Sequence, residues 1–224
     1  MYHYVKTDDS GWVLALKSDN KTTISLCSYT KTQVITRSNG RTLFKVCDGP
    51  NKELVVSMKN ENAGLYLSNH PKDIPAQAEA SLTVVYKKRD NAWYSKARNQ
   101  TLDQQMGALS FLGKTVEVTL NSDWGGGYTP IAVGEYKIKI PDSPHDGNMT
   151  SYYRNVAPKL RYDQVWFPIE HGNNSRYVHV GNVSDGCVTV VDLEKWNDIY
   201  SYLIRHRALG GKHVGKLVVK LKAS

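Results

Sequence analysis

The chain has 224 residues, of which 40% are hydrophobic, and its formal net charge is +8. Its length and apolar content allow one large core or two small ones, but no apolar stretch approaches the length of a membrane-spanning helix, and the N-terminal residues are not a secretory signal. The basic triplet Lys87, Lys88 and Arg89 falls far short of a dedicated nucleic-acid surface, so we expect neither membrane insertion nor a nucleic-acid partner.

The first hundred residues alternate short apolar runs with polar turns. Residues 12–20, 53–62 and 82–91 each begin as a strand and end in a Lys-bearing turn with Asp or Asn. This pattern resembles the repeat unit of a β-trefoil-like module, although the third copy is poor and the spacing uneven. An unrelated small β domain is the alternative, and the sequence leaves both open.

The boundary of this front domain is predicted from composition. Two stretches resemble linkers, namely 70–78, which contains two prolines, and 100–107. We therefore divide the chain into a β-rich binding or accessory domain at 1–105 and a second domain at 106–224. The boundary lies between 72 and 107.

The second half reads as strands with one helix. Residues 165–169 and 177–180 are rich in β-branched and aromatic side chains and form a predicted hairpin, and 187–191 is a further strand. One amphipathic helix is predicted, with Asp192 as its N-cap and apolar residues at helical spacing up to a glycine pair. Alternation over 213–221 predicts a closing strand. The expected fold is mostly β with one packed helix.

A histidine and a cysteine carry the chemistry of this half. His179 lies in the second hairpin strand, and Cys187 opens the next strand directly behind a glycine. A thiol becomes a useful nucleophile only as thiolate, which a nearby imidazole produces by taking the proton. Gly186 lets a substrate carbonyl approach backbone N–H groups that hold an oxyanion. The alternative is a small buried cysteine with a structural role.

Four segments, taken in order, resemble the L,D-transpeptidase family, the YkuD-type catalytic domain that cross-links or trims bacterial peptidoglycan. They are a Gly-rich Thr-Pro segment at 125–136, a Pro-rich stretch at 141–145, the aromatic strand at 165–169, and the Ser-Asp-Gly-Cys run at 184–187. The resemblance covers about 106–224, and its specificity comes from the order of the pieces. It implies an L,D-transpeptidase-like β-sandwich with one packed helix behind a small β domain.

The resemblance also implies roles for individual residues. Cys187 is implied as the nucleophile, His179 as its base and Ser184 as part of the catalytic motif. The backbone N–H groups of Gly186 and Asp185 join that of Cys187 as implied oxyanion donors. Asp185 stands where the family usually has a histidine. A carboxylate beside the sulfur would raise the thiol pKa, so we expect Asp185 to contribute its backbone rather than its side chain.

Three further residues are candidates for substrate contact or an auxiliary role. Tyr128 belongs to the Gly-rich segment, and His145 follows two prolines that hold an extended turn, where it either faces a cleft or is solvated. His171 is a rival base because its spacing to Cys187 is close to the family's. The strand pattern places His171 in the hairpin turn and favours His179.

The implied reaction is acyl transfer on peptidoglycan stem peptides. Cys187 would attack the amide between a diamino acid and a D-amino acid, and an amine acceptor then gives a cross-link while water gives a carboxypeptidase. The sequence does not choose between these acceptors. A catalytically inactive cell-wall or glycan-binding protein is the alternative. No cofactor is expected, and no metal, because no Cys-x-x-Cys or His-Glu-x-x-His spacing occurs.

The implied substrate lies in the periplasm or cell wall. Either a signal has been removed from the N-terminus, or the chain reaches its substrate through a specialised secretion system, as an antibacterial effector whose producer carries an immunity protein. The positive charge suits acidic wall polymers. Cys27 and Cys47 either pair after export or stay buried and reduced.

Overall fold

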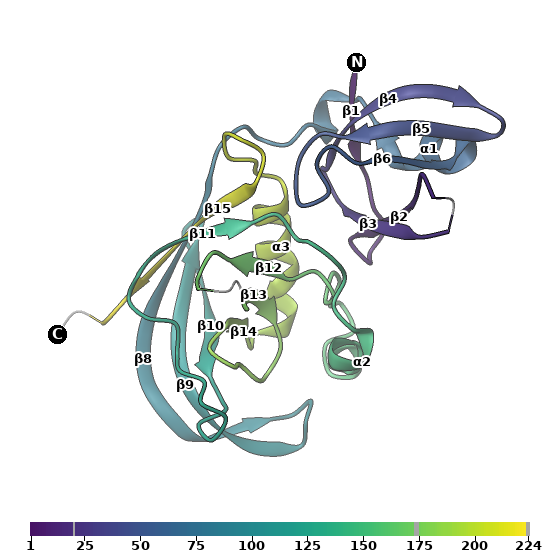
Figure 1. The fold of residues 1–224 in the computed structure, drawn as a ribbon. Coiled ribbons are helices and arrows are strands. Elements are labelled where there is room, and N and C mark those ends of the chain that lie inside the picture. The colour runs from purple at the N-terminus through teal and green to yellow at the C-terminus, as the bar shows by residue number, and fades with distance from the viewer. Residues whose placement is uncertain (20, 173–174, 223–224) are drawn as a thin grey trace.

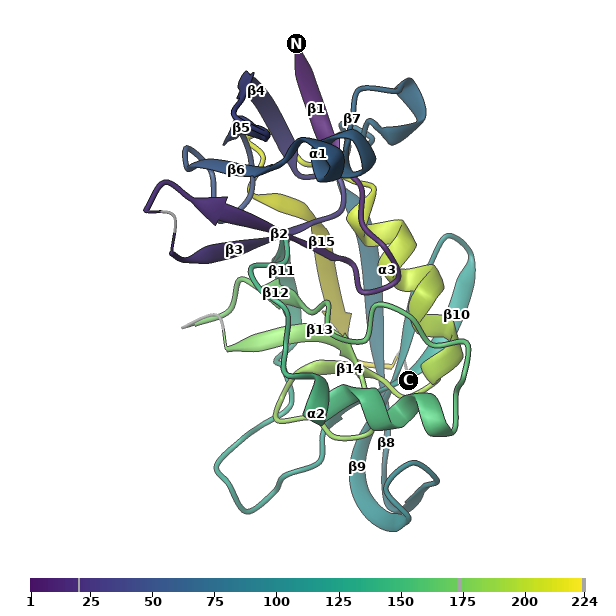
Figure 2. The same ribbon diagram turned by 90° about the vertical axis from the view of Figure 1, so that its right-hand side faces the viewer.

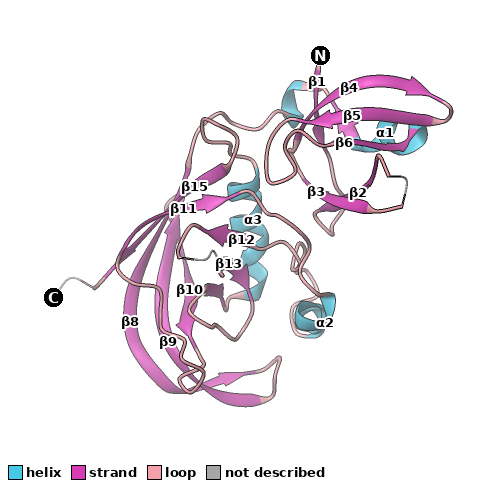
Figure 3. Cartoon of the chain, in the orientation of Figure 1, coloured by secondary structure: helices cyan, strands magenta, loops and turns pink. Residues whose placement is uncertain are grey.

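The computed structural model describes residues 1–19, 21–172 and 175–222. They form a mostly β structure, with one antiparallel sheet of seven strands and one closed mixed sheet of eight, plus three short α-helices (Figures 1 and 3). The mostly β prediction is therefore confirmed. Among the described residues, no helix is both long enough and apolar enough to span a membrane.

The first sheet comes from the N-terminal part of the chain. Its strand order is β3-β2-β6-β5-β4-β1-β7, and a short helix, α1, follows β6. Alternate side chains such as Leu26, Phe44 and Val56 point to one face and form a separate core, as expected for strands with one buried face. The elements are β1 (Tyr2–Val5), β2 (Trp12–Lys17), β3 (Thr23–Cys27), β4 (Lys31–Ser38), β5 (Arg41–Val46), β6 (Val55–Lys59), α1 (Asn60–Tyr66) and β7 (Leu67–Ser68).

The second sheet closes on itself in the order β10-β14-β13-β12-β11-β15-β8-β9. Two of its pairs are parallel, β13 with β14 and β15 with β8, and the others are antiparallel. Closure leaves no edge strand unpaired. The strands are β8 (Ala80–Ser95), β9 (Gln100–Phe111), β10 (Lys114–Asn121), β11 (Gly134–Lys139), β12 (Phe167–Ile169), β13 (Arg176–Val180), β14 (Val188–Val190) and β15 (His213–Lys220).

The closed sheet includes residues that the sequence assigned to the front of the chain. The run at 82–91, read as a third repeat, lies in β8, and the stretch 100–107, read as a linker, lies in β9. That linker prediction was wrong because β9 pairs with β8 and β10 along most of its length. The chain therefore passes from one sheet to the other through residues 69–79, and position 106 falls inside a strand.

Helix α3 (Trp196–Ile204) is the longest of the α-helices and packs against the closed sheet (Figure 2). The indole of Trp196 is fully buried and lies 6.1 Å from the ring of Phe167 in β12. The helix begins later than predicted, because Leu193–Lys195 forms a 3-10 turn. Asp192 is the N-cap residue of this turn, but its side chain makes no capping hydrogen bond. The remaining α-helix is α2 (Gly147–Thr150).

The two sheets are joined by buried contacts. Asp48 and Arg207 form an ion pair at 3.3 Å in which both side chains are almost fully buried, and Arg207 Nη2 also donates to the Ser28 carbonyl oxygen. Trp12 and Cys27 come from the first sheet but pack in the core of the second. Burial of a charged pair at this junction fixes the orientation of one sheet on the other, because either charge left alone would be strongly unfavourable.

The cysteines of the first sheet are not linked. Cys27 is buried, Cys47 is partly buried, and both are free thiols in the structure. Burial raises the pKa of each thiol above its ordinary value, so both are protonated at neutral pH. Of the two alternatives that the sequence left open, the structure has the reduced one.

Candidate functional site

The site is built on the parallel pair β13 and β14. In their register His179 lies opposite Thr189, and Cys187 comes directly before β14. Thr189 points to the same side as His179, because the two side chains are hydrogen-bonded to each other. The thiol and the imidazole both line a cavity of about 560 Å³. The closed sheet thus brings the two predicted catalytic side chains to one cavity.

His179 is held by two hydrogen bonds. Its Nδ1 lies 3.0 Å from the Val180 carbonyl oxygen, and its Nε2 lies 2.9 Å from the Thr189 hydroxyl. A carbonyl can only accept, so Nδ1 carries the proton and Nε2 accepts from Thr189. Burial, with a smaller effect from the charge of His145, lowers the pKa of His179 to about 3, against the opposing effect of the hydrogen bond to Val180. The imidazole is therefore neutral at neutral pH, with its basic nitrogen directed at Thr189.

An aromatic stack fixes the plane of this imidazole. The Trp166 ring stacks nearly parallel on both histidines, with ring centroids 3.9 Å apart for His179 and 3.8 Å apart for His145. Tyr177 meets the edges of His145 and Trp166. The indole restricts rotation of both imidazoles. The sequence left His145 either facing a cleft or solvated; in the structure it is partly buried, stacks on Trp166 and does not line the cavity.

Cys187 is 6% exposed, at the wall of the cavity. The pKa of its thiol is raised to about 11, mainly by burial and to a lesser extent by the charge of Asp185, against the opposing effects of the Tyr177 backbone and Arg176. The thiol is consequently protonated at neutral pH. A base within the cavity is required before the sulfur can act as a nucleophile.

The turn that precedes the cysteine is tightly held. Gly186 has φ +81°, and Nη1 of Arg176 donates at 2.7 Å to both the Gly186 and the Thr129 carbonyl oxygens. Ser184 is buried, its hydroxyl donates to the Cys187 carbonyl oxygen, and its backbone N–H donates to the Ser122 hydroxyl. Ser184 therefore positions the turn, with its hydroxyl engaged away from the sulfur.

The other predicted residues separate into two groups. Tyr128 and Asp185 line the cavity, and burial together with the charge of Asp123 raises the pKa of the Asp185 carboxyl group. The charge of Asp185 raises the pKa of the Cys187 thiol, but less than burial does. That Asp185 contributes its backbone rather than its side chain stays a prediction. His171 lies after β12, with its ring 5.4 Å from Tyr136, and does not line the cavity. The predicted turn also includes residues 173–174, which lie outside the described residues.

Sequence reasoning missed three side chains that shape the site. Thr189 could have been found, because alternation in the predicted strand at 187–191 puts it on the face of Cys187. Trp166 was read only as part of an aromatic strand, and nothing in its spacing signals a stack with His179. Arg98 lines the cavity from the turn between β8 and β9 and donates to the Tyr152 hydroxyl at 2.8 Å. No local pattern reveals that this distant hairpin reaches the site.

Comparison of the chain with protein-family models, with curated proteins and with solved structures gives no match. Among the described residues, no group of three or more His, Cys, Asp and Glu side chains is placed to hold a metal ion. The functional argument therefore depends on the geometry of the cavity around Cys187 and on its chemistry.

Proposed function

We propose that this protein performs cysteine-dependent acyl transfer on peptidoglycan stem peptides, with β8 to β15 as an L,D-transpeptidase-like catalytic unit and the first sheet as a binding or accessory unit. One observation carries the proposal, namely that His179 in β13 and Cys187, which directly precedes the neighbouring strand β14, line one cavity. A neutral imidazole and a protonated thiol in one cavity are the resting state proposed for a nucleophile that is activated on substrate binding.

The proposed first step transfers the thiol proton to the imidazole. The Thr189 hydroxyl has a second acceptor, the Val183 carbonyl oxygen at 3.3 Å, and turning to it frees Nε2 of His179. The sulfur of Cys187 then forms a bond to the substrate carbonyl carbon, and the proton passes from His179 to the departing amine as the C–N bond breaks. Water or a second amine releases the acyl group from the sulfur and restores the thiol.

The charges of the cavity suit a stem peptide. The cation is Arg98, which lines the cavity and donates a hydrogen bond to the Tyr152 hydroxyl. The anion is Asp185, which lines the same cavity as Cys187. A terminal D-amino acid carries a carboxylate that a guanidinium binds well, and a diamino acid carries an ammonium that a carboxylate binds. Backbone N–H groups at Asp185, Gly186 and Cys187 are the proposed oxyanion donors.

Digestion of purified sacculi, followed by mass analysis of the muropeptides, tests the proposal. The wild-type protein is expected to remove the terminal D-amino acid or to form new diamino-acid cross-links, and Cys187→Ala is expected to abolish both. Cys47→Ala is the matched control, since it removes a free, partly buried thiol outside the cavity. A muropeptide profile unchanged by the wild-type protein would count against the enzyme.

A second function, an inactive wall- or glycan-binding protein, is favoured by two observations. In the structure Nε2 of His179 is occupied by Thr189, and the Cys187 thiol has a raised pKa. This alternative predicts that sacculi retain the wild-type protein and Cys187→Ala equally, with no change in muropeptides.

If the protein is the proposed enzyme, its site of action is the periplasm or cell wall after export, and an immunity protein would protect the producer by covering the cavity.

A further inference from the structure

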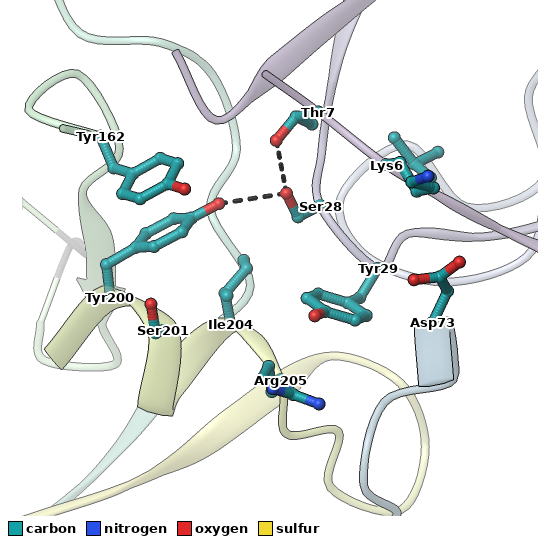
Figure 4. Close-up of a pocket in the computed structure, with 11 residues that line it drawn as sticks. Lys6, Thr7, Ser28, Tyr29, Asp73, Tyr162, Tyr200, Ser201, Ile204 and Arg205 are labelled. Carbon is teal, nitrogen blue, oxygen red and sulfur yellow. Dashed lines mark hydrogen bonds between the residues drawn. The ribbon is translucent and has the colours of Figure 1, made fainter. Parts of the chain in front are cut away.

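A second cavity, called the crevice below, lies where the two sheets meet, away from the cavity of Cys187. It has a volume of about 240 Å³ and is lined by the segment after β1, the turn between β3 and β4, and helix α3 (Figure 4). None of its lining residues lines the cavity of Cys187. The buried pair Asp48 and Arg207 holds the two sheets together close by, with Arg207 bonded to the Ser28 carbonyl oxygen.

Two tyrosines of this crevice have an unusual backbone. Tyr29 has φ +64° and Tyr162 has φ +59°, in the left-handed region that bulky side chains rarely adopt. Among the described non-glycine residues, four others have positive φ, and all four are exposed: Asn39, Glu53, Asn99 and Leu112. Strain of this kind persists where the surroundings enforce it and clusters at ligand sites. Both strained tyrosines present their rings to the same crevice.

A third ring and a chain of hydroxyls complete one wall. Tyr162 stacks on Tyr200 with ring centres 3.8 Å apart. The Tyr200 hydroxyl donates to the Ser28 hydroxyl at 3.1 Å, and the Ser28 and Thr7 hydroxyls share a hydrogen bond of 2.6 Å (Figure 4). Flat aromatic faces beside hydroxyl groups are suited to a ligand that is a ring with its own hydroxyl groups.

The charges of the crevice are unbalanced. Lys6 and Arg205 line it, and within the described parts of the chain neither side chain takes part in a salt bridge. The Arg205 guanidinium lies 6.0 Å from the centre of the Tyr29 ring. Asp73 is the one carboxylate among the lining residues, and it accepts a hydrogen bond from Ser68. Two cations therefore face one carboxylate, which favours an anionic ligand.

We infer that this crevice binds a single acidic sugar ring, that is, a polyhydroxylated ring that carries a carboxylate. A volume of about 240 Å³ is below the range typical of drug-sized ligands and suits one ring. The tyrosine faces receive the ring, Asp73 accepts from its hydroxyls, and Arg205 with Lys6 binds the carboxylate. Inorganic phosphate would use the cations but not the aromatic rings of the crevice.

Titration of the isotope-labelled protein, followed by amide NMR spectra, tests the inference with glucuronate as the probe. Glucuronate is expected to bind saturably and to shift the amide signals of Tyr29, Tyr162 and Arg205. Glucose, which lacks the carboxylate, is expected to bind about tenfold more weakly or worse. Phosphate that binds as tightly as glucuronate, or glucuronate that shifts none of these signals, would overturn the inference.

Two variants make the test specific to the crevice. Tyr29→Gly removes a ring at a position where glycine adopts the positive φ without strain, so the backbone is retained while the affinity for glucuronate is expected to fall about tenfold. Leu112→Gly is the matched control at an exposed positive-φ residue and is expected to bind as the wild type does. Arg205→Gln changes an exposed side chain and is expected to lose the preference for glucuronate over glucose. Wild-type affinity in both Tyr29→Gly and Arg205→Gln would refute the site. Because the inference does not use Cys187, the titration gives the same result whether or not peptidoglycan is the substrate.

Discussion

Replacement of Gly186 tests how the turn before the nucleophile is held. An added Cβ would lie 2.5 Å from the Thr129 carbonyl oxygen and 2.4 Å from Nη1 of Arg176, at a residue with φ +81°. An L-residue in this conformation costs about 1–2 kcal/mol. Displacing Arg176 also loses two hydrogen bonds, which contribute about 1 kcal/mol each at a partly exposed guanidinium.

We therefore expect Gly186→Ala to lower the free energy of unfolding by about 3–4 kcal/mol. Gly113→Ala is the matched control, because Gly113 has φ +74° and no atom within 4 Å of an added Cβ. That variant is expected to lose only the conformational part, about 1–2 kcal/mol. Urea denaturation followed by tryptophan fluorescence measures both values.

A third variant separates the two parts of the Gly186 penalty. In an Arg176→Met background the guanidinium is gone, so Gly186→Ala is expected to cost less than in the wild-type background, while the clash with the Thr129 carbonyl remains. Equal losses in Gly186→Ala and Gly113→Ala would show that the turn yields without cost, and would refute the reasoning.

Three further predictions concern titration and the junction of the sheets. The pKa of His179 is about 3 in the folded protein and 6.5 in the free group. The unfolded chain therefore binds a proton at this group first, so the free energy of unfolding falls by up to about 1.4 kcal/mol per pH unit as the pH drops from 6.5 toward 3. This slope should vanish in His179→Gln. The rate of Cys187 alkylation by iodoacetamide, followed by mass spectrometry, should rise with pH up to about 11, and a plateau near 9 would contradict the buried thiol. Arg207→Met should lower stability by about 3–5 kcal/mol, and adding Asp48→Asn should restore part of it, as measured by urea denaturation.

The sequence predicts the site well where local patterns decide the structure. The hairpin of β12 and β13 and the strand after Cys187 follow from β-branched and aromatic runs, and they place His179 beside the cysteine strand. The same alternation would have identified Thr189. The parallel pairing of β13 with β14 does not follow from either strand, because it depends on the whole closed sheet.

The parts that the sequence does not predict depend on long-range pairing. Residues 100–107 have a polar composition typical of a linker, yet they lie in a strand because β8 and β10 supply its hydrogen-bond partners. Arg98 reaches the cavity only because the long hairpin of β8 and β9 curves toward Tyr152. Asp192 is a good N-cap by residue type, but a 3-10 turn separates it from α3. Tertiary pairing outweighs local preference in the strand that contains residues 100–107.

The most direct test of the proposed chemistry is the mass of the intact protein after brief incubation with a purified stem tetrapeptide. An acyl-enzyme is expected, seen as a gain equal to the tripeptide acyl group and located on Cys187 by peptide mapping. The gain should be absent in Cys187→Ala and slower to form in His179→Gln. Release of the terminal D-amino acid by Cys187→Ala at the wild-type rate, or an unmodified Cys187 while the wild-type protein turns over the peptide, would contradict the nucleophile.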